Sequence, residues 1–260
     1  MVELLNQLKS DFNVVGVKME FEAEGTRLEE AMRLKEISLR AGCHLTLKIG
    51  GCEAIRDMYE AANLGTDNLV APMVETPYAL KKYLSAIKIG FPDDVRRGMK
   101  FFINIETDTA VKNFTSMMAM PETKDLDGIV IGRVDLCGSL NLTRDDINSE
   151  KIESVTCKIA IDAKKNDKLV VVGGGVSFAS LDFLNNIPKG YIDRYETRKI
   201  VFKCPEALTN SKKAFLLAVE FELMWLKNKQ NYYKQISKED ESRLNMMEAR
   251  YKNQINSIMN

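Results

Sequence analysis

Short apolar runs alternate along this chain with segments in which apolar residues recur every three or four positions. Uninterrupted apolar runs are typical of strands in a parallel sheet, which is covered on both faces. Ile129–Ile131, set between Gly128 and Gly132, is a clear case. The predicted strands are Val14–Glu20, Cys43–Ile49, Asn68–Met73, Met99–Thr107, Ile129–Ile131, Leu169–Val172 and Tyr191–Lys203, the last of which forms one strand or two.

Helical patterns fill the intervals between these strands. Thr26-Arg-Leu-Glu29 has the form of a capping box before an apolar stripe that ends at Gly42. Strands that alternate with helices predict βαβ units and a parallel sheet. We therefore expect a closed (β/α)8 TIM barrel, with an open doubly wound sheet as the alternative. Gly173–Gly175 lacks the Rossmann spacing, and no Walker A pattern is present.

Composition narrows the class of protein. Lys+Arg and Asp+Glu balance at 37 each in 260 residues, so no global field attracts nucleic acid or an anionic membrane. No apolar run approaches membrane-spanning length, and the N-terminus lacks the pattern of a signal peptide. Five cysteines without metal-type spacing predict free thiols in a reducing cytoplasm. The single histidine, His44, excludes a His-rich zinc site and precedes its strand, so we expect it at the opposite end of the barrel.

Polar side chains stand where the predicted strands end. Glu106 and Asp135 follow neighbouring apolar strands, and the ends of parallel strands converge on one mouth of a barrel. Two carboxylates at this point form the smallest unit that holds a hard divalent cation. The same position is occupied by Lys18, Glu20, Lys48, Glu75, Gly173–Gly175, Glu196 and Arg198. The alternative is that polar residues follow strands simply because loops are polar.

The two carboxylates lie in motifs that resemble a known family. Ile103–Thr107 and Asp127–Leu140 are similar to the metal-binding signature of the HpcH/HpaI aldolase and citrate lyase family, and Val70–Thr76 and Leu47–Gly51 resemble two further segments of it. The resemblance implies a (β/α)8 barrel that cleaves or forms a carbon–carbon bond next to a 2-oxo acid such as pyruvate. It implies Mg²⁺ or Mn²⁺ on Glu106 and Asp135, acting as a Lewis acid that stabilises an enolate.

The resemblance also suggests roles for other residues of the mouth. Lys48 stands where the family has a substrate-binding arginine, Arg133 stands where the aldolases have proline, and we expect Lys48, Asn104, Arg133 and Gly174 to bind substrate. Gly174 belongs to a glycine run that either cradles a carboxylate or makes a tight turn.

The catalytic histidine of the bacterial aldolases is missing, because the matching stretch is Phe21–Gly25. Lys48, Glu20 and Glu24 are therefore the expected catalytic residues, with Glu22 or a metal-bound water as further candidates for the general base. Two other functions remain open: a citrate-lyase-like cleavage of a 3-hydroxyacyl-CoA ester, and a catalytically silent barrel that binds a small acid.

The C-terminal fifth of the chain differs in character. We divide the chain into a barrel domain at 1–204 and C-terminal helices at 205–260. Ala207–Lys227 is apolar on most sides, which predicts a helix that covers the barrel, and Ser237–Asp240 caps a last helix. Leu244, Met247, Tyr251 and Ile258 follow heptad spacing, although Gln254 interrupts it. We expect a homo-oligomer through these helices, the alternative being a helix folded back on its own barrel.

Overall fold

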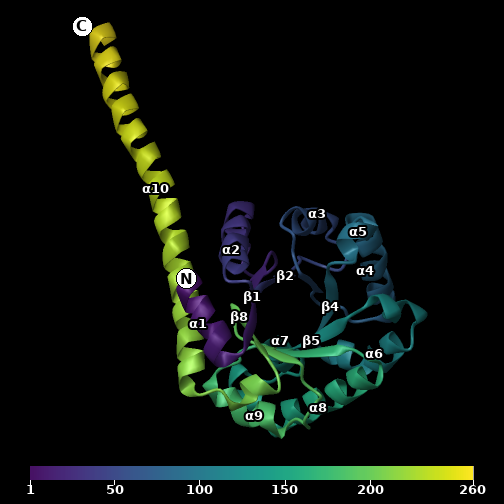
Figure 1. The fold of residues 1–260 in the computed structure, drawn as a ribbon. Coiled ribbons are helices and arrows are strands. Elements are labelled where there is room, and N and C mark those ends of the chain that lie inside the picture. Colours follow the sequence, from purple (N-terminus) through teal and green to yellow (C-terminus); the bar gives the residue numbers. More distant parts are fainter. Residues whose placement is uncertain (260) are drawn as a thin grey trace.

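A computed structural model describes residues 1–259 and shows a closed barrel of eight strands surrounded by helices (Figure 1). The predicted fold class is confirmed. The strands are β1 Val14–Glu20, β2 His44–Lys48, β3 Asn68–Ala71, β4 Lys100–Ile105, β5 Gly128–Gly132, β6 Leu169–Gly173, β7 Arg194–Glu196 and β8 Ile200–Lys203. Tyr191–Lys203 thus divides into two strands.

The eighth strand reverses direction. Strands β1 to β7 pair in parallel, whereas β8 is antiparallel both to β7 and to β1. Only Thr197–Lys199 connects β7 to β8, and a parallel crossover needs a dozen residues or more. The mouth therefore carries a tight turn at this position in place of a long βα loop.

Helices cover the outside of the barrel. They are α1 Val2–Phe12, α2 Leu28–Arg40, α3 Ile55–Asn63, α4 Pro77–Gly90, α5 Asp93–Arg96, α6 Asp108–Met118, α7 Arg133–Ser139, α8 Glu150–Lys165, α9 Leu181–Asn186 and α10 Lys212–Met259, with 3₁₀ turns η1 Pro121–Asp125, η2 Arg144–Asn148, η3 Phe178–Ser180 and η4 Glu206–Thr209. Thr76 caps α4 by accepting the Ala79 N–H, and Thr107 caps α6 by accepting the Ala110 N–H. None of the described helices combines the length and hydropathy needed to cross a membrane.

Alternation along β4 explains how polar groups enter the barrel. Phe102 packs inside the barrel with Val70, Val130 and Val171, which together close its lower part. Successive side chains point to opposite faces of a strand, so residues 104 and 106 share the inward face with Phe102. The outward residues pack against the helices in one large core.

The C-terminal segment is one continuous helix, so the prediction of two helices is wrong. The polar stretch Asn228–Ile236 contains neither glycine nor proline, and nothing in it stops a helix. The first half of α10 packs on its own barrel through Phe215, Ala218, Phe221 and Trp225, all buried. Its second half projects beyond the barrel as an isolated arm (Figure 1).

Candidate active site at the barrel mouth

Glu106 follows β4 and is the most deeply buried carboxylate at the mouth, with 1% of its surface exposed. Its Oε1 accepts the Met73 N–H at 3.0 Å, and its Oε2 accepts the Asn104 amide at 2.6 Å. No cationic side chain of the described residues lies within 4 Å of it. Burial raises the pKa of Glu106, the charge of Lys48 opposes this shift, and Asp135 adds to it. A buried carboxylate without an ion-pair partner is costly, which points to a function.

Gly132, at the end of β5, leaves the space that Glu106 occupies. A Cβ atom at this position would lie 2.7 Å from Glu106 Oε2. Asp135 follows in the first turn of α7, where its side chain is exposed. Its charge acts on Glu106, so the two carboxylates predicted to converge lie near one another. The sequence signal for Gly132 was present, because glycine ends an otherwise apolar strand.

Asn104 lies below Glu106 on the same face of β4 and is almost fully buried. Its amide nitrogen donates to Glu106, whereas its Oδ1 is buried and has no hydrogen-bond partner. Buried oxygen acceptors are normally satisfied, so this orphaned atom marks a place where a ligand or water belongs. The structure thus brings Asn104 into the predicted site.

Lys48 ends β2 beside Glu106, and its side chain is 8% exposed. Its Nζ pairs with Glu22 Oε2 at 2.8 Å, although that oxygen lacks well-aligned hydrogen-bond geometry. Burial disfavours the charged amine, but Glu106, Glu22 and Glu20 outweigh burial and raise the pKa of Lys48. The lysine therefore remains a cation among carboxylates. It can bind an anionic substrate group but is a poor proton acceptor.

Glu20 is held by another lysine. Lys18 Nζ lies 2.5 Å from Glu196 Oε1 and 3.1 Å from Glu20 Oε1, in the interior between β1 and β7. Burial opposes the charged form of Glu20, but Lys18 and Lys48 outweigh it and lower the pKa of this carboxyl. The pKa of Lys18 is raised, because its two glutamates outweigh burial. Glu20 lies in the predicted site as a fixed structural anion.

Glu24 is held from the turn between β7 and β8. Arg198 Nε lies 3.2 Å from its Oε1, and the nearly buried Lys199 pairs with its Oε2. The role of Lys199 was not foreseen, since nothing in the sequence relates it to residue 24. Glu20 and Glu22 each pair with one lysine, and Glu24 pairs with two cations. Glu22 differs from the other two in exposure, since its side chain is 31% exposed against 10% for Glu20 and 11% for Glu24.

Comparison with known proteins now gives the family. The model described as HpcH/HpaI aldolase/citrate lyase matches residues 41–173, about half of the chain. The chain belongs to the HpcH/HpaI aldolase/citrate lyase family. Comparison with curated protein sequences gave no match.

Solved structures of this family share the fold. The HpcH/HpaI aldolase from Desulfitobacterium hafniense DCB-2 superimposes with a TM-score of 0.58 at 13% identity, over 74% of this chain and 88% of that one. Citrate synthase SbnG gives a TM-score of 0.61 at 12% identity, over 89% of this chain and 91% of that one. An HpcH/HpaI aldolase/citrate lyase family protein from Burkholderia cenocepacia J2315 gives a TM-score of 0.58 at 13% identity, over 88% of this chain and 100% of that one. Membership of this family of aldolases and lyases supports a lyase activity.

Arg133 departs from what the family resemblance predicted. The side chain is fully buried, and its guanidinium donates to Gly173 O, Ile147 O, Asn148 Oδ1 and Ser180 Oγ. It also lies over the Phe183 ring at 4.6 Å, and burial lowers its pKa to about 10. These bonds hold α7 against the loop after β6, so we do not retain Arg133 as a substrate ligand.

Gly174 serves the same packing. Its φ is +76°, and a Cβ would lie 2.5 Å from the Arg133 backbone nitrogen. The tight-turn alternative accounts for this glycine. His44, at the start of β2, is exposed and lies 3.6 Å from Asp67, at the end of the barrel away from Glu106, as predicted.

The residues of the mouth fit a divalent cation with an incomplete protein ligand set. No three acidic, histidine or cysteine side chains of residues 1–259 cluster as ligands. Mg²⁺ keeps several waters and is often held by one or two carboxylates, which Glu106 and Asp135 provide. The mouth contains the carboxylates Glu20, Glu22, Glu24, Glu106, Asp135 and Glu196 and the cations Lys18, Lys48, Arg198 and Lys199. With Glu75, which follows β3, carboxylates outnumber cations there, and a divalent cation would offset part of this excess.

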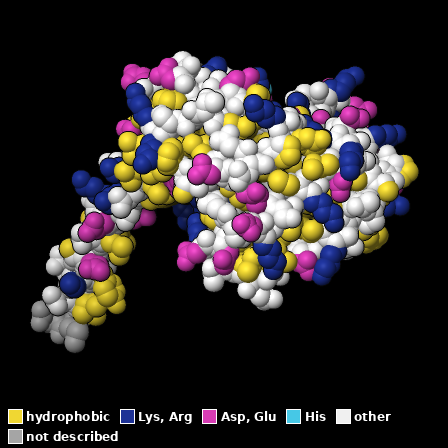
Figure 2. All heavy atoms as spheres, turned by 90° about the horizontal axis from the view of Figure 1, so that it is seen from below, with side chains coloured by type: hydrophobic (Ala, Val, Ile, Leu, Met, Phe, Trp, Pro, Cys, Tyr) yellow, Lys and Arg dark blue, Asp and Glu magenta, His cyan; other side chains and the backbone are white. Residues whose placement is uncertain are grey.

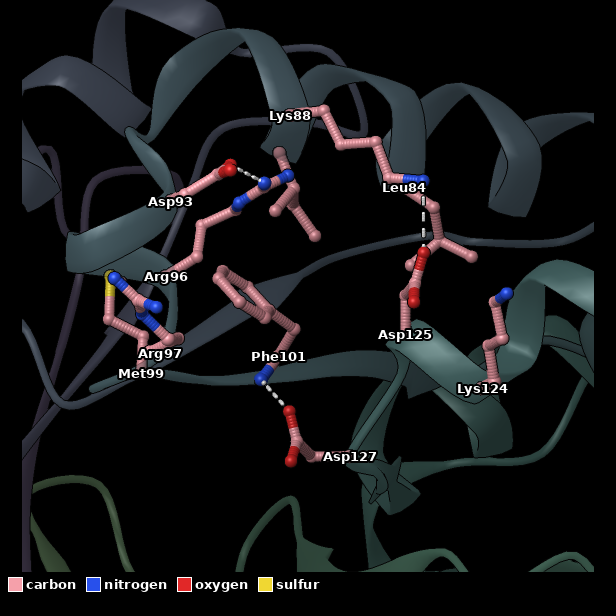
Figure 3. Close-up of a pocket in the computed structure, with 11 residues that line it drawn as sticks. Leu84, Lys88, Asp93, Arg96, Arg97, Met99, Phe101, Lys124, Asp125 and Asp127 are labelled. Carbon is pink, nitrogen blue, oxygen red and sulfur yellow. Dashed lines mark hydrogen bonds and ion pairs between the residues drawn. The ribbon is translucent and has the colours of Figure 1, made fainter.

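A hollow at the other end of the barrel is separate from this site. It encloses about 600 Å³ between α4, α5 and the start of β4. Figure 3 shows the residues that line it. Its charges are paired locally, with Lys88 on Asp125 at 3.0 Å and Arg96 on Asp93. Asp127 accepts the Phe101 N–H at 2.8 Å. We assign no chemistry to this hollow.

Proposed function

We propose that the protein is a divalent-metal-dependent carbon–carbon lyase of the class II aldolase type. It cleaves or forms a bond next to a 2-oxo acid such as pyruvate, with an aldehyde as the second substrate. The observation that carries the proposal is Glu106, a nearly buried carboxylate without an ion-pair partner beside a second acid, Asp135, at the mouth of a barrel of this family.

Glu106 and Asp135 would hold Mg²⁺ or Mn²⁺, to which carboxylate oxygens are equally suited. When bound, the cation supplies Lewis-acid stabilisation of negative charge that develops on the carbonyl oxygen of the substrate. Met73 N–H and the Asn104 amide fix the Glu106 carboxylate through two hydrogen bonds. Fixed ligands do not have to reorganise during the reaction.

Lys48 binds the substrate carboxylate in this proposal. Its cation is buried beside the metal-binding acids, and its present partner is the partly exposed Glu22. A substrate carboxylate at Lys48 Nζ displaces Glu22 from the ion pair. A lysine lacks the bidentate geometry of arginine, so a single charged contact would set the affinity for the acid.

Glu22 is then the proton acceptor. Once released from Lys48, its carboxylate takes a proton from the carbon next to the carbonyl and returns it to that carbon or to the second substrate. Glu20 and Glu24 are nearly buried and stay paired with Lys18, Arg198 and Lys199, whereas the more exposed Glu22 is released when the substrate takes its lysine. In this proposal Glu22 takes the role that the sequence analysis expected of Glu20 or Glu24.

The test is exchange of the methyl protons of pyruvate for deuterium, followed by mass spectrometry with Mg²⁺, with Mn²⁺ and with EDTA. We expect metal-dependent exchange that is lost in Glu106→Gln and Asp135→Asn. Asp125→Asn, which removes a half-buried carboxylate at the other end of the barrel, is the matched control and should exchange normally. No exchange by the metal-loaded, folded protein would refute the pyruvate aldolase.

Two outcomes would redirect the assignment. Exchange with acetyl-CoA in place of pyruvate would indicate the acyl-CoA lyase. Binding of Mg²⁺, measured by calorimetry, without exchange on either compound would indicate a catalytically silent barrel. Glu22→Gln should slow exchange by about 10²-fold or more without changing Mg²⁺ affinity, and Glu24→Gln should have a much smaller effect.

A further inference from the structure

The distal half of α10 exposes apolar side chains that the barrel does not cover. From residue 234 to 258 every residue is exposed except Ile255, which is half-buried. Leu244, Met247 and Tyr251 are each at least half exposed. Figure 2 shows hydrophobic atoms along one side of the arm in that view. An isolated helix with an apolar stripe gains its stability from a partner on that stripe.

The stripe extends along the whole helix with a seven-residue repeat. Positions spaced alternately three and four apart run from Leu216 to Ile258 and form a seam typical of coiled coils. The apolar members are Leu216, Val219, Leu223, Leu226, Tyr233, Leu244, Met247, Tyr251 and Ile258, and the polar members are Gln230, Ser237, Asp240 and Gln254. Such a repeat drifts slowly around a straight helix, which a left-handed supercoil corrects.

The first half of this seam is free although α10 is docked on its own barrel. Leu216 and Val219 are 67% and 61% exposed, whereas Ala218 and Phe221, on the other side of the helix, are buried. The two sides are separate from Leu216 to Leu226, so a partner can cover this part of the seam without displacing α10. The seam touches its own barrel at Tyr233, whose hydroxyl donates to Glu30 of α2 at 2.7 Å.

We propose that α10 of a second copy of this chain covers the seam, parallel and in register. The flanking charges favour this partner. Glu241 and Glu248 lie on one side of the distal seam, and Arg243 and Arg250 lie on the other. In a parallel pair each Arg243 meets Glu248 of the second copy, five residues further on. In an antiparallel pair arginines face arginines and glutamates face glutamates.

The proximal charges agree with the parallel arrangement. Glu222 and Lys227 occupy equivalent flanking positions and form a second attractive pair. Lys229 would face Lys234, but its Nζ is already paired with Glu30 at 2.9 Å within its own chain. Asp240 is the one charged residue in the seam itself and opposes the pairing. Asp240→Leu should therefore strengthen the dimer.

Sedimentation velocity of the full chain at several concentrations tests the partner. We expect a dimer, its loss in Met247→Glu, and its retention in Ala249→Glu, which places the same charge on the opposite side of the same turn. A wild-type monomer up to about 100 μM would overturn the proposal. So would a dimer that survives Met247→Glu, since its interface would lie elsewhere.

Charge reversal tests the orientation. Arg243→Glu should raise the dimer dissociation constant by about tenfold, because two symmetric pairs change from attractive to repulsive. Adding Glu248→Arg in the same chain should restore the wild-type constant. An antiparallel coil predicts the opposite sign, since Arg243→Glu would relieve repulsion between arginines.

Cysteine cross-linking gives an independent readout of register. Met247→Cys and Gln254→Cys should each form a disulfide-linked dimer, and the outward-facing Asn256→Cys should not. In an antiparallel coil, at most one of residues 247 and 254 could face the same residue of the second copy. Cross-linking of only one position, or of Asn256→Cys equally, would overturn the parallel register.

Discussion

Carboxylates lie at both ends of this barrel, and they serve different purposes. At the end away from Glu106, Asp67, Asp127 and Asp193 each precede an odd-numbered strand and accept the first free backbone N–H of the strand before it. Their donors, at 2.7 to 2.8 Å, are the backbone nitrogens of Leu45, Phe101 and Val170. Each aspartate thus joins two neighbouring strands where the ladder begins.

The carboxylates at the mouth are fixed in position, but their capacity to bind a ligand is not filled. Glu106 accepts two hydrogen bonds, lies against the orphaned Asn104 Oδ1, and has a second carboxylate nearby. At the other end, lysines complete the pairing: Lys35 lies 3.2 Å from Asp67 and Lys164 lies 2.5 Å from Asp193. A carboxylate at a strand end is therefore not by itself a sign of function. A better sign is a carboxylate that lacks an ion-pair partner.

The largest expected difference between the two ends is in catalysis. Glu106→Gln should reduce metal-dependent proton exchange by about 10²–10³-fold, since it removes a ligand charge where the reaction develops charge. Asp127→Asn should leave the rate per folded molecule within about threefold, because its partner is a backbone N–H. Equal losses of initial rate in the two variants would contradict the distinction between the carboxylates at the two ends of the barrel.

Two glycines of β5 allow the two ends of the barrel to be compared by adding a methyl group at each. In Gly132→Ala the new methyl would press on Glu106 Oε2 at 2.7 Å, so we expect activity to fall more than stability. In Gly128→Ala it would meet the Phe102 ring at 2.5 Å and the Leu169 carbonyl at 2.6 Å, so we expect the fold to lose about 1–3 kcal/mol. Urea denaturation and exchange rates measured on both variants separate these outcomes.

A smaller effect concerns the strand junction itself. Asp127→Ala leaves the Phe101 N–H without its acceptor, which should lower the free energy of unfolding by about 1–3 kcal/mol. Chemical denaturation at neutral pH gives the value. A loss below the error of the measurement would show that water replaces the carboxylate.

The smallest effect is on pH dependence, and its sign should differ between the ends. Burial raises the pKa of Glu106, so in metal-free protein its charged form destabilises the fold above that pKa, and Glu106→Gln should be more stable than wild type at pH 7. This advantage should shrink as the pH falls below the raised pKa and should vanish below the unfolded pKa of about 4.3. Denaturation in EDTA at several pH values measures it.

Asp67 provides the opposite case. Burial disfavours its charge, but the Leu45 N–H and Lys35 outweigh burial and lower its pKa. Its contribution to stability is therefore complete above the unfolded pKa of about 3.9 and is lost as the pH falls through the folded value. Asp67→Asn should be less stable than wild type at pH 7 and should converge with it once the pH falls below the lowered pKa of the folded protein. The same sign for both variants would contradict this account.

The sequence predicted the barrel and placed Glu106 and Asp135 correctly at strand ends because strand pattern and chain order are local features. It did not predict that Arg133 is buried, since Asn148 and Ser180, which satisfy it, lie far along the chain. The ranking of Glu20, Glu22 and Glu24 likewise depends on ion pairs with Arg198 and Lys199, which only the closed barrel brings together.

The sequence contains enough information to predict the direction of β8. Only three residues separate the two β-rich runs, which excludes a crossover and predicts a hairpin with an antiparallel β8. The expectation of a regular barrel had instead favoured a parallel strand. The single long helix was also readable, because no residue between Asn228 and Ile236 breaks a helix.

The position of β8 in the chain also makes barrel closure a late step during synthesis. Val14 pairs with Phe202, so the first strand waits for nearly the whole barrel sequence before its second neighbour exists. Until then β1 presents an open edge, which in a nascent chain is a site for mispairing. Because β7 and β8 are close in sequence and pair as a hairpin, we expect them to form together before the closing step joins β8 to the open edge of β1.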